Sequence, residues 1–115
     1  MKIIIVGDGK VGFTLAEHLS QEEHDVTVID TNDEALRHAS DALDVMCVKG
    51  NGASISALRE SGVDAADVLI AATSMDEVNM VCCLTAKRLG AKFTIARVRN
   101  VEYAMEFSHL KDELG

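Results

Sequence analysis

Residues 1–12, MKIIIVGDGKVG, join an apolar run typical of a buried strand directly to a GxGxxG motif. In this context Gly7 allows a tight turn, Gly9 lets the backbone approach a pyrophosphate, and Gly12 lets the following helix pack closely on the strand. The phosphates would bind at the N-terminus of that helix, where unpaired N–H groups and the helix dipole favour anions. Asp30 ends the next apolar run, at the spacing expected of an acid that accepts hydrogen bonds from a ribose 2′-hydroxyl. These parts predict a dinucleotide site; the alternative is that the glycines serve only a turn and Asp30 only starts a loop.

The composition is that of one ordinary globular domain, residues 1–115. Of the 115 residues 48% are hydrophobic and 3% aromatic, which is enough for an aliphatic core. The net charge is −8 and Lys and Arg form no cluster, which argues against a nucleic-acid partner. The apolar runs are far shorter than the ~18 residues of a membrane span, and no secretory signal pattern is present. We therefore expect a cytoplasmic protein with no direct membrane insertion.

The cysteines and histidines indicate neither a disulfide framework nor a metal site. The three cysteines, Cys47, Cys82 and Cys83, are odd in number and two are adjacent, which favours reduced, buried thiols. No histidine is spaced with a cysteine as in a zinc site. We expect no bound metal.

Apolar runs alternate with segments of helical period along the whole chain. The expected strands cover residues 2–6, 25–30, 44–49, 68–72 and 93–98, and the expected helices 10–21, 32–40, 55–61, 75–89 and 101–114. Thr31 and Ser74 each begin a capping-box pattern, Gly90 fits a left-handed helix stop, and Asn100 can cap the last helix. This alternation predicts an α/β fold, a Rossmann-like doubly wound parallel sheet in strand order 3-2-1-4-5. A sixth strand of the full Rossmann layout would lie beyond the chain end.

In such sheets ligands bind outside the carboxyl ends of the strands, so the loops there supply the candidate contacts. The candidate nucleotide-binding residues are Gly7, Asp8, Gly9, Lys10, Val11, Gly12, Asp30, Thr31, Asn51, Gly52, Ala53, Thr73, Ser74 and Arg97. Gly50, Asn51 and Ala53 would border the adenine, and Thr73 and Ser74 the phosphates or second ribose. Lys10 and Arg97 are the cations placed for phosphate charge. Two alternatives remain open: Ser74 serves only as a cap, and Arg97 pairs with an acid.

The motifs favour a sensed ligand over a cosubstrate. An acid at position 30 repels a 2′-phosphate, so NAD(H) is favoured over NADP(H), but ATP, ADP and AMP share the same adenosine ribose. The chain has no Walker A loop and no nucleophile elbow, and Tyr103 lacks a lysine four positions later. We therefore expect no catalytic residues. The alternatives are the cofactor-binding half of an NAD-dependent oxidoreductase, and a nucleotide-regulated transcription or scaffold protein.

Beyond the glycines, several segments resemble one family closely. They are residues 1–7, 28–30, 50–52, 72–80 and 95–99. Together they resemble the N-terminal RCK domains, also called KTN domains, of TrkA-type potassium-uptake regulators. The resemblance implies a Rossmann domain that binds NAD(H) or adenine nucleotides, through Gly7 to Val11, Asp30, Asn51, Thr73, Ser74 and Arg97. It also implies homodimers or larger rings on a membrane potassium transporter, at the cytoplasmic face of the membrane. Nucleotide occupancy would change the ring and so gate transport.

The last expected helix offers a surface for such assembly. Tyr103, Phe107, Leu110 and Leu114 recur at helical spacing, with Val101 and Met105 beside them. This is more apolar surface than one sheet face needs, and it would suit an interface. The alternative is that these side chains pack only on their own sheet.

Overall fold

The computed structural model describes the backbone of residues 1–114 and the side-chain surroundings of residues 1–109. Its centre is a five-stranded parallel sheet in the order β3-β2-β1-β4-β5, which confirms the predicted topology. The strands are β1 (Lys2–Val6), β2 (Asp25–Asp30), β3 (Met46–Lys49), β4 (Val68–Ala71) and β5 (Phe93–Ala96). The helices are α1 (Lys10–Gln21), α2 (Asp33–Ala42), α3 (Ile55–Glu60), η1 (Val63–Ala65), α4 (Asp76–Leu89) and α5 (Val101–Leu114).

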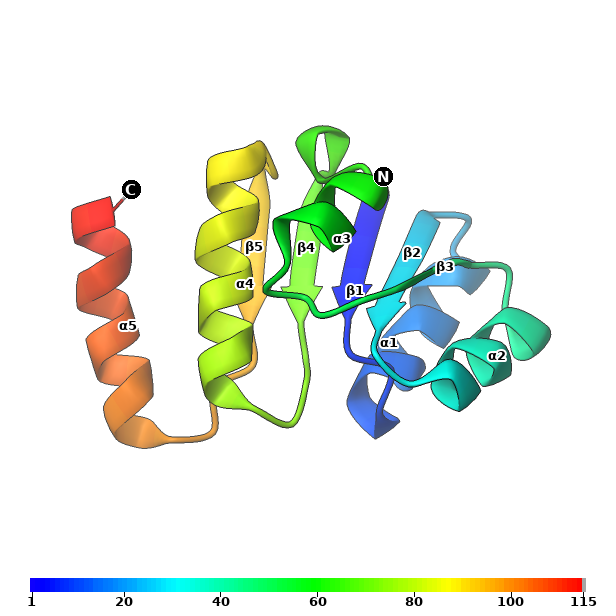
Figure 1. Cartoon of the computed structure of the whole chain (residues 1–115), viewed down its shortest axis with the longest axis horizontal. Coiled ribbons are helices and arrows are strands. Elements are labelled where there is room, and N and C mark those ends of the chain that lie inside the picture. Colours follow the sequence, from blue (N-terminus) through cyan, green and yellow to red (C-terminus); the bar gives the residue numbers. More distant parts are fainter. Residues whose placement is uncertain (115) are drawn as a thin grey trace.

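Helices cover both faces of the sheet, and β1 lies at its centre (Figure 1). Because successive strand residues point to opposite faces, Ile4 and Val6 join the core under α3 and α4. Ile3 and Ile5 join the second core, under α1 and α2. All four side chains are almost fully buried, which is why β1 is a continuous apolar run. Helix α5 stands beyond α4, at the outer end of the molecule (Figure 1).

Two of the four predicted helix caps differ in the structure. Helix α2 is capped by Asn32, whose side chain accepts the N–H groups of Glu34 and Ala35, and not by Thr31. The reason is that Asp30 accepts the Asn32 N–H at 2.8 Å, which extends the turn by one residue. Helix α4 has Met75 at its N-cap with no side-chain cap, so the predicted cap by Ser74 is wrong.

The other two predicted ends are confirmed. Gly90 adopts φ of 119° at the end of α4, and the Asn100 side chain accepts the N–H groups of Glu102 and Tyr103. Three strands are shorter than predicted, because β3 begins at Met46, β4 ends at Ala71 and β5 ends at Ala96. In the part of the chain that the structure describes, no helix has the length and apolar character to cross a membrane.

Candidate functional site

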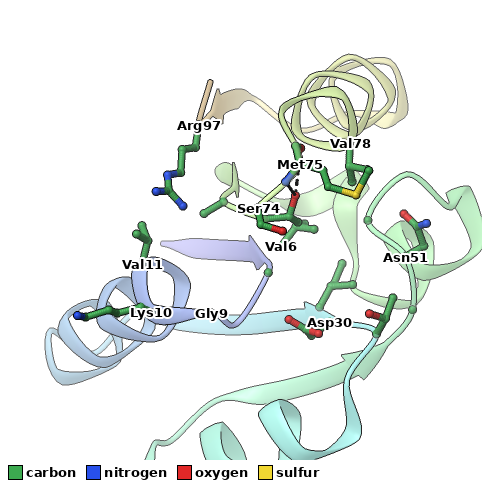
Figure 2. A pocket seen from close by; sticks show the side chains of 17 residues that line it. Val6, Gly9, Lys10, Val11, Asp30, Asn51, Ser74, Met75, Val78 and Arg97 are labelled. Atoms are coloured by element: carbon green, nitrogen blue, oxygen red, sulfur yellow. Dashed lines mark hydrogen bonds between the residues drawn. The ribbon is translucent and has the colours of Figure 1, made fainter. Parts of the chain in front are cut away.

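A cavity of about 610 Å³ opens at the carboxyl ends of β1, β2 and β4. This is the point where the strand order reverses, because β1 has β2 on one side and β4 on the other. The cavity is lined by Val6, Gly7, Gly9, Lys10, Val11, Ile29, Asp30, Thr31, Gly50, Asn51, Gly52, Ala72, Thr73, Ser74, Met75, Val78 and Arg97. Figure 2 shows Asp30 across the cavity from Ser74, with Arg97 and Asn51 on opposite sides of the view.

The glycine loop joins β1 to α1 through very close backbone contacts. Gly7 has φ of 96°, a left-handed conformation that favours glycine, and its N–H donates to the Ile29 carbonyl at 2.8 Å. A Cβ on Gly12 would lie 1.8 Å from the Gly7 carbonyl oxygen. Helix α1 can therefore approach the turn this closely only if residue 12 is glycine. A Cβ on Gly9 would meet no protein atom within 4 Å, because this residue borders the cavity.

The N-terminus of α1 is suited to anions. Gly9 is its N-cap and supplies no side-chain cap, and the first turn contains no acidic residue. The first N–H groups of the helix therefore keep their hydrogen-bonding capacity and their positive dipole end. Lys10 and Val11 of this turn line the cavity. The arrangement fits a phosphate group, as the spacing of the glycines predicts.

Asp30 is held at the cavity by the backbone around it. One carboxylate oxygen accepts the Asp8 N–H at 2.6 Å, and the other accepts the Asn32 N–H at 2.8 Å. These bonds fix the carboxylate at the end of β2 and leave further acceptor positions on both oxygens. A pair of ribose hydroxyls is the kind of donor that such a carboxylate binds.

Asn79 organises the other wall of the cavity and is not among the predicted site residues. Its side chain is completely buried. Its Oδ1 accepts from the Thr73 N–H at 2.9 Å and from the Thr73 hydroxyl at 2.7 Å. Its Nδ2 donates to the carbonyls of Thr73 at 3.1 Å and of Arg97 at 2.8 Å. One amide thus ties the loop after β4 to the end of β5.

A signal for Asn79 was present in the sequence. It precedes Cys82, Cys83 and Ala86 by three, four and seven positions, and all of these residues are buried on one face of α4. A polar residue on the buried face of a helix must find hydrogen-bond partners, so its position marks a network.

The end of β5 is attached to the start of α4 through Asp76. Its carboxylate accepts the N–H groups of Arg99 at 3.1 Å and Asn100 at 2.8 Å, and these bonds hold its pKa below the usual range. The Arg99 guanidinium donates to the Ser74 carbonyl at 2.6 Å. Arg97 forms no ion pair within residues 1–109 and extends beside the cavity (Figure 2).

Eleven of the fourteen candidate residues line the cavity, and Asp8, Gly12 and Ala53 do not. Gly12 lies inside α1 against Gly7, and the Ala53 N–H donates to the Asn51 side chain at 2.8 Å. Six further residues complete the lining: Val6, Ile29, Gly50, Ala72, Met75 and Val78. Gly52 has no positive φ; it is glycine because a Cβ would lie 2.1 Å from a methyl group of Val6.

Comparison with known proteins identifies the domain family that this chain matches. The family model of the TrkA-N domain matches residues 3–113. "Trk system potassium uptake protein TrkA" of Halomonas elongata is 51% identical over 104 residues, which are 90% of this chain and 23% of that protein. The chain therefore spans about a quarter of the length of this relative.

Solved structures share the fold. The "GsuK channel bound to NAD" superposes with a TM-score of 0.81 at 25% identity, over 94% of this chain and 20% of that one. The Kef C-terminal domain of Shewanella denitrificans "in AMP bound form" gives a TM-score of 0.80 at 19% identity, over 96% of this chain and 67% of that one. The likeness at 19% identity concerns the fold alone.

Proposed function

The chain belongs to the TrkA-N domain family, and we propose that residues 1–115 form one nucleotide-sensing domain of a potassium-uptake regulator. The observation that carries the proposal is the cavity between the open N-terminus of α1 and the fixed carboxylate of Asp30. These two features suit the phosphates and the ribose of the same nucleotide. Relatives named as Trk potassium uptake proteins supply the transport context.

We propose NAD(H) as the ligand, with ATP, ADP and AMP as the alternatives. The carboxylate of Asp30 disfavours a 2′-phosphate by charge repulsion, so NADP(H) is the weaker ligand. Asn51 and the backbone of the Gly50–Gly52 loop would border the adenine. Arg97, at the other side of the view in Figure 2, would meet phosphate charge or the second half of a dinucleotide. A neighbour at 25% identity that is named as bound to NAD supports the dinucleotide.

The ligand acts in this proposal as a signal and not as a cosubstrate. Hydride transfer needs an acid or base near the nicotinamide, and the described lining holds no His, Tyr or Cys. Lys10 and Asp30 are the titratable groups of the lining besides Arg97, and both lie where phosphate and ribose would bind. The alternative, the cofactor-binding half of an NAD-dependent oxidoreductase, would require a substrate site supplied by another part of the protein.

We propose that the output is a change in a homodimer or ring that contacts a membrane potassium transporter from its cytoplasmic face. Exposed apolar side chains on β5 and α5 support an assembly surface there. They are Phe93, Ile95, Val101 and Met105, each more than half exposed. Phe107 is partly buried against the core, while the side chains of Leu110 and Leu114 lie outside the described residues. The bonds of Asn79 and Asp76 connect this end of the chain to the cavity.

Native mass spectrometry of the purified chain tests ligand and assembly together. We expect adducts with NAD⁺, NADH or AMP, and a dimer as the smallest main species. A chain that remains monomeric at high concentration contradicts the assembly proposal. A chain that binds none of these nucleotides contradicts the ligand proposal, and turnover of NADH with small carbonyl compounds would favour the oxidoreductase.

Asp30→Ala is expected to weaken NADH binding at least tenfold, which is about 1.4 kcal/mol or more, because charge-assisted hydrogen bonds to the ribose are lost. Isothermal titration calorimetry measures the change. Asp33→Ala is the matched control, since Asp33 lies three residues away, pairs with Lys49 at 3.0 Å and does not line the cavity. Equal affinities of the Asp30 variant and the control would exclude the ribose role.

A further inference from the structure

Asp8 is a buried acid whose carboxylate has no hydrogen-bond partner in the part of the chain that the structure describes. The residue is 7% exposed, and within residues 1–109 neither carboxylate oxygen has a hydrogen-bond partner. It stands between Gly7 and Gly9, both of which line the cavity, although Asp8 itself does not. A carboxylate in this situation loses its hydration without compensation, so the neutral, protonated form is favoured. An unpartnered acid inside the glycine loop between β1 and α1 requires an explanation other than direct ligand contact.

The groups around Asp8 come from three elements. Asp30, at the end of β2, accepts the Asp8 backbone N–H at 2.6 Å, which brings the two acidic residues together. His38 of α2, which stacks on Phe13 with ring centroids 4.7 Å apart, and Cys47 of β3 complete the titratable surroundings. Lys10, the nearest cation in the sequence, points away from Asp30 in Figure 2. Burial and the charge of Asp30 therefore dominate the environment of the Asp8 carboxylate.

Burial raises the pKa of Asp8 most, and the charge of Asp30 adds to this effect, so that the pKa is about 6. His38 acts in the opposite direction. The charge of Asp8 in turn adds to the effect of burial in raising the pKa of the Cys47 thiol. Asp8 thus changes its charge in a range where ordinary aspartates are fully ionised. The geometry alone already disfavours ionisation, and the electrostatics agree with it.

We propose that Asp8 is a proton-binding site coupled to the nucleotide site, so that nucleotide binding takes up a proton from solvent onto the Asp8 carboxylate. The inference rests on the proposed nucleotide function. Phosphates bound at Gly9–Val11 place negative charge next to Asp8 in sequence and space, and they exclude water from the loop. Both effects favour the neutral carboxyl, and by linkage a protonated Asp8 favours the nucleotide. The affinity of the domain for nucleotide would therefore increase as the pH falls.

The experiment measures proton uptake by calorimetry with NAD⁺, whose pyrophosphate does not titrate between about pH 5 and pH 8. Binding is recorded near pH 6.5 in two buffers of different ionisation enthalpy, and the difference gives the protons taken up. We expect net uptake by the natural chain, and an affinity about fivefold lower at pH 7.5 than at pH 5.5. Asp8→Asn is expected to abolish the uptake and to bind NAD⁺ about fivefold more tightly at pH 7.5.

Two measurements separate this proposal from its alternatives. His38→Gln should retain the uptake, because the proton binds Asp8; loss of uptake in this variant alone would overturn the assignment. The second is a carbon-13 NMR titration of the Asp8 carboxyl in the nucleotide-free chain. A midpoint at the usual aspartate value overturns the proton site even if NAD⁺ binds. A raised midpoint in a chain that binds no nucleotide overturns the proposed function and, with it, the coupling.

Discussion

Gly12→Ala is expected to lower the free energy of unfolding by about 3 kcal/mol, a large part of the total stability of a small domain. The added Cβ would lie 1.8 Å from the Gly7 carbonyl oxygen and 2.8 Å from its carbonyl carbon. Both are backbone atoms of the turn that leads from β1, so no side-chain rotation relieves the overlap. Helix α1 would have to move away from the strand and lose part of its packing. Urea denaturation followed by circular dichroism measures the effect.

Gly9→Ala is the matched control, because it adds the same methyl group three residues earlier in the same loop. The Cβ would meet no protein atom within 4 Å, and the φ of −76° suits any residue, so stability should change little. The methyl would enter the cavity where a pyrophosphate is proposed, so nucleotide affinity should fall while the fold remains. Equal destabilisation by both substitutions would show that the close contact between Gly7 and Gly12 does not cause the loss of stability.

Asn79→Asp is expected to destabilise the chain by about 3 kcal/mol near pH 8, although the two side chains have the same shape. The substitution removes the amide that donates to the carbonyls of Thr73 and Arg97, and places a buried negative charge beside both oxygens. Burial should raise the pKa of the introduced carboxyl. The deficit should therefore shrink as the pH falls and the carboxyl becomes a donor again. Urea denaturation at pH 8 and pH 5 measures the difference.

Asn51→Asp provides the control for this prediction. Asn51 is exposed, and its Oδ1 accepts the Ala53 N–H at 2.8 Å, a role that a carboxylate oxygen fills equally well. The free energy of unfolding of the Asn51→Asp variant should differ from that of the natural chain by less than about 0.5 kcal/mol. An Asn79 variant as stable as this control would mean that the loop after β4 does not depend on the buried amide.

The sheet was predictable because its signals are local and consistent. The continuous apolar run of β1, the glycines after it and the Asp30 that ends β2 each have one common structural use. Helix ends were less predictable, because several residues compete for each cap. Thr31 and Asn32 can both begin α2, and the choice depends on the hydrogen bond from Asn32 to Asp30, which only the folded turn forms.

The lining of the cavity was predictable where backbone position decides it and not where side-chain direction does. Gly9, Asp30 and Thr73 line the cavity because they end a strand, cap a helix or follow a strand at one edge of the sheet. Asp8 shares that position in sequence, but its side chain is buried outside the lining. Asn79 lies inside a helix and reaches the site through four hydrogen bonds, which strand and loop assignments do not reveal.

The central position of β1 has a consequence for the order in which the chain folds. Its partner on one side, β2, follows closely in the sequence, whereas the pairing with β4 joins Ile3 to Val68. Such distant contacts cost more loop-closure entropy and tend to form late. One wall of the cavity comes from the loops after β1 and β2, and the other comes from the loop after β4. The cavity therefore exists only once β4 has paired with β1. We expect the cavity to be incomplete in the folding transition state, and interactions absent from that state act on the unfolding rate. Bound nucleotide would therefore prolong the lifetime of the folded chain without speeding its formation.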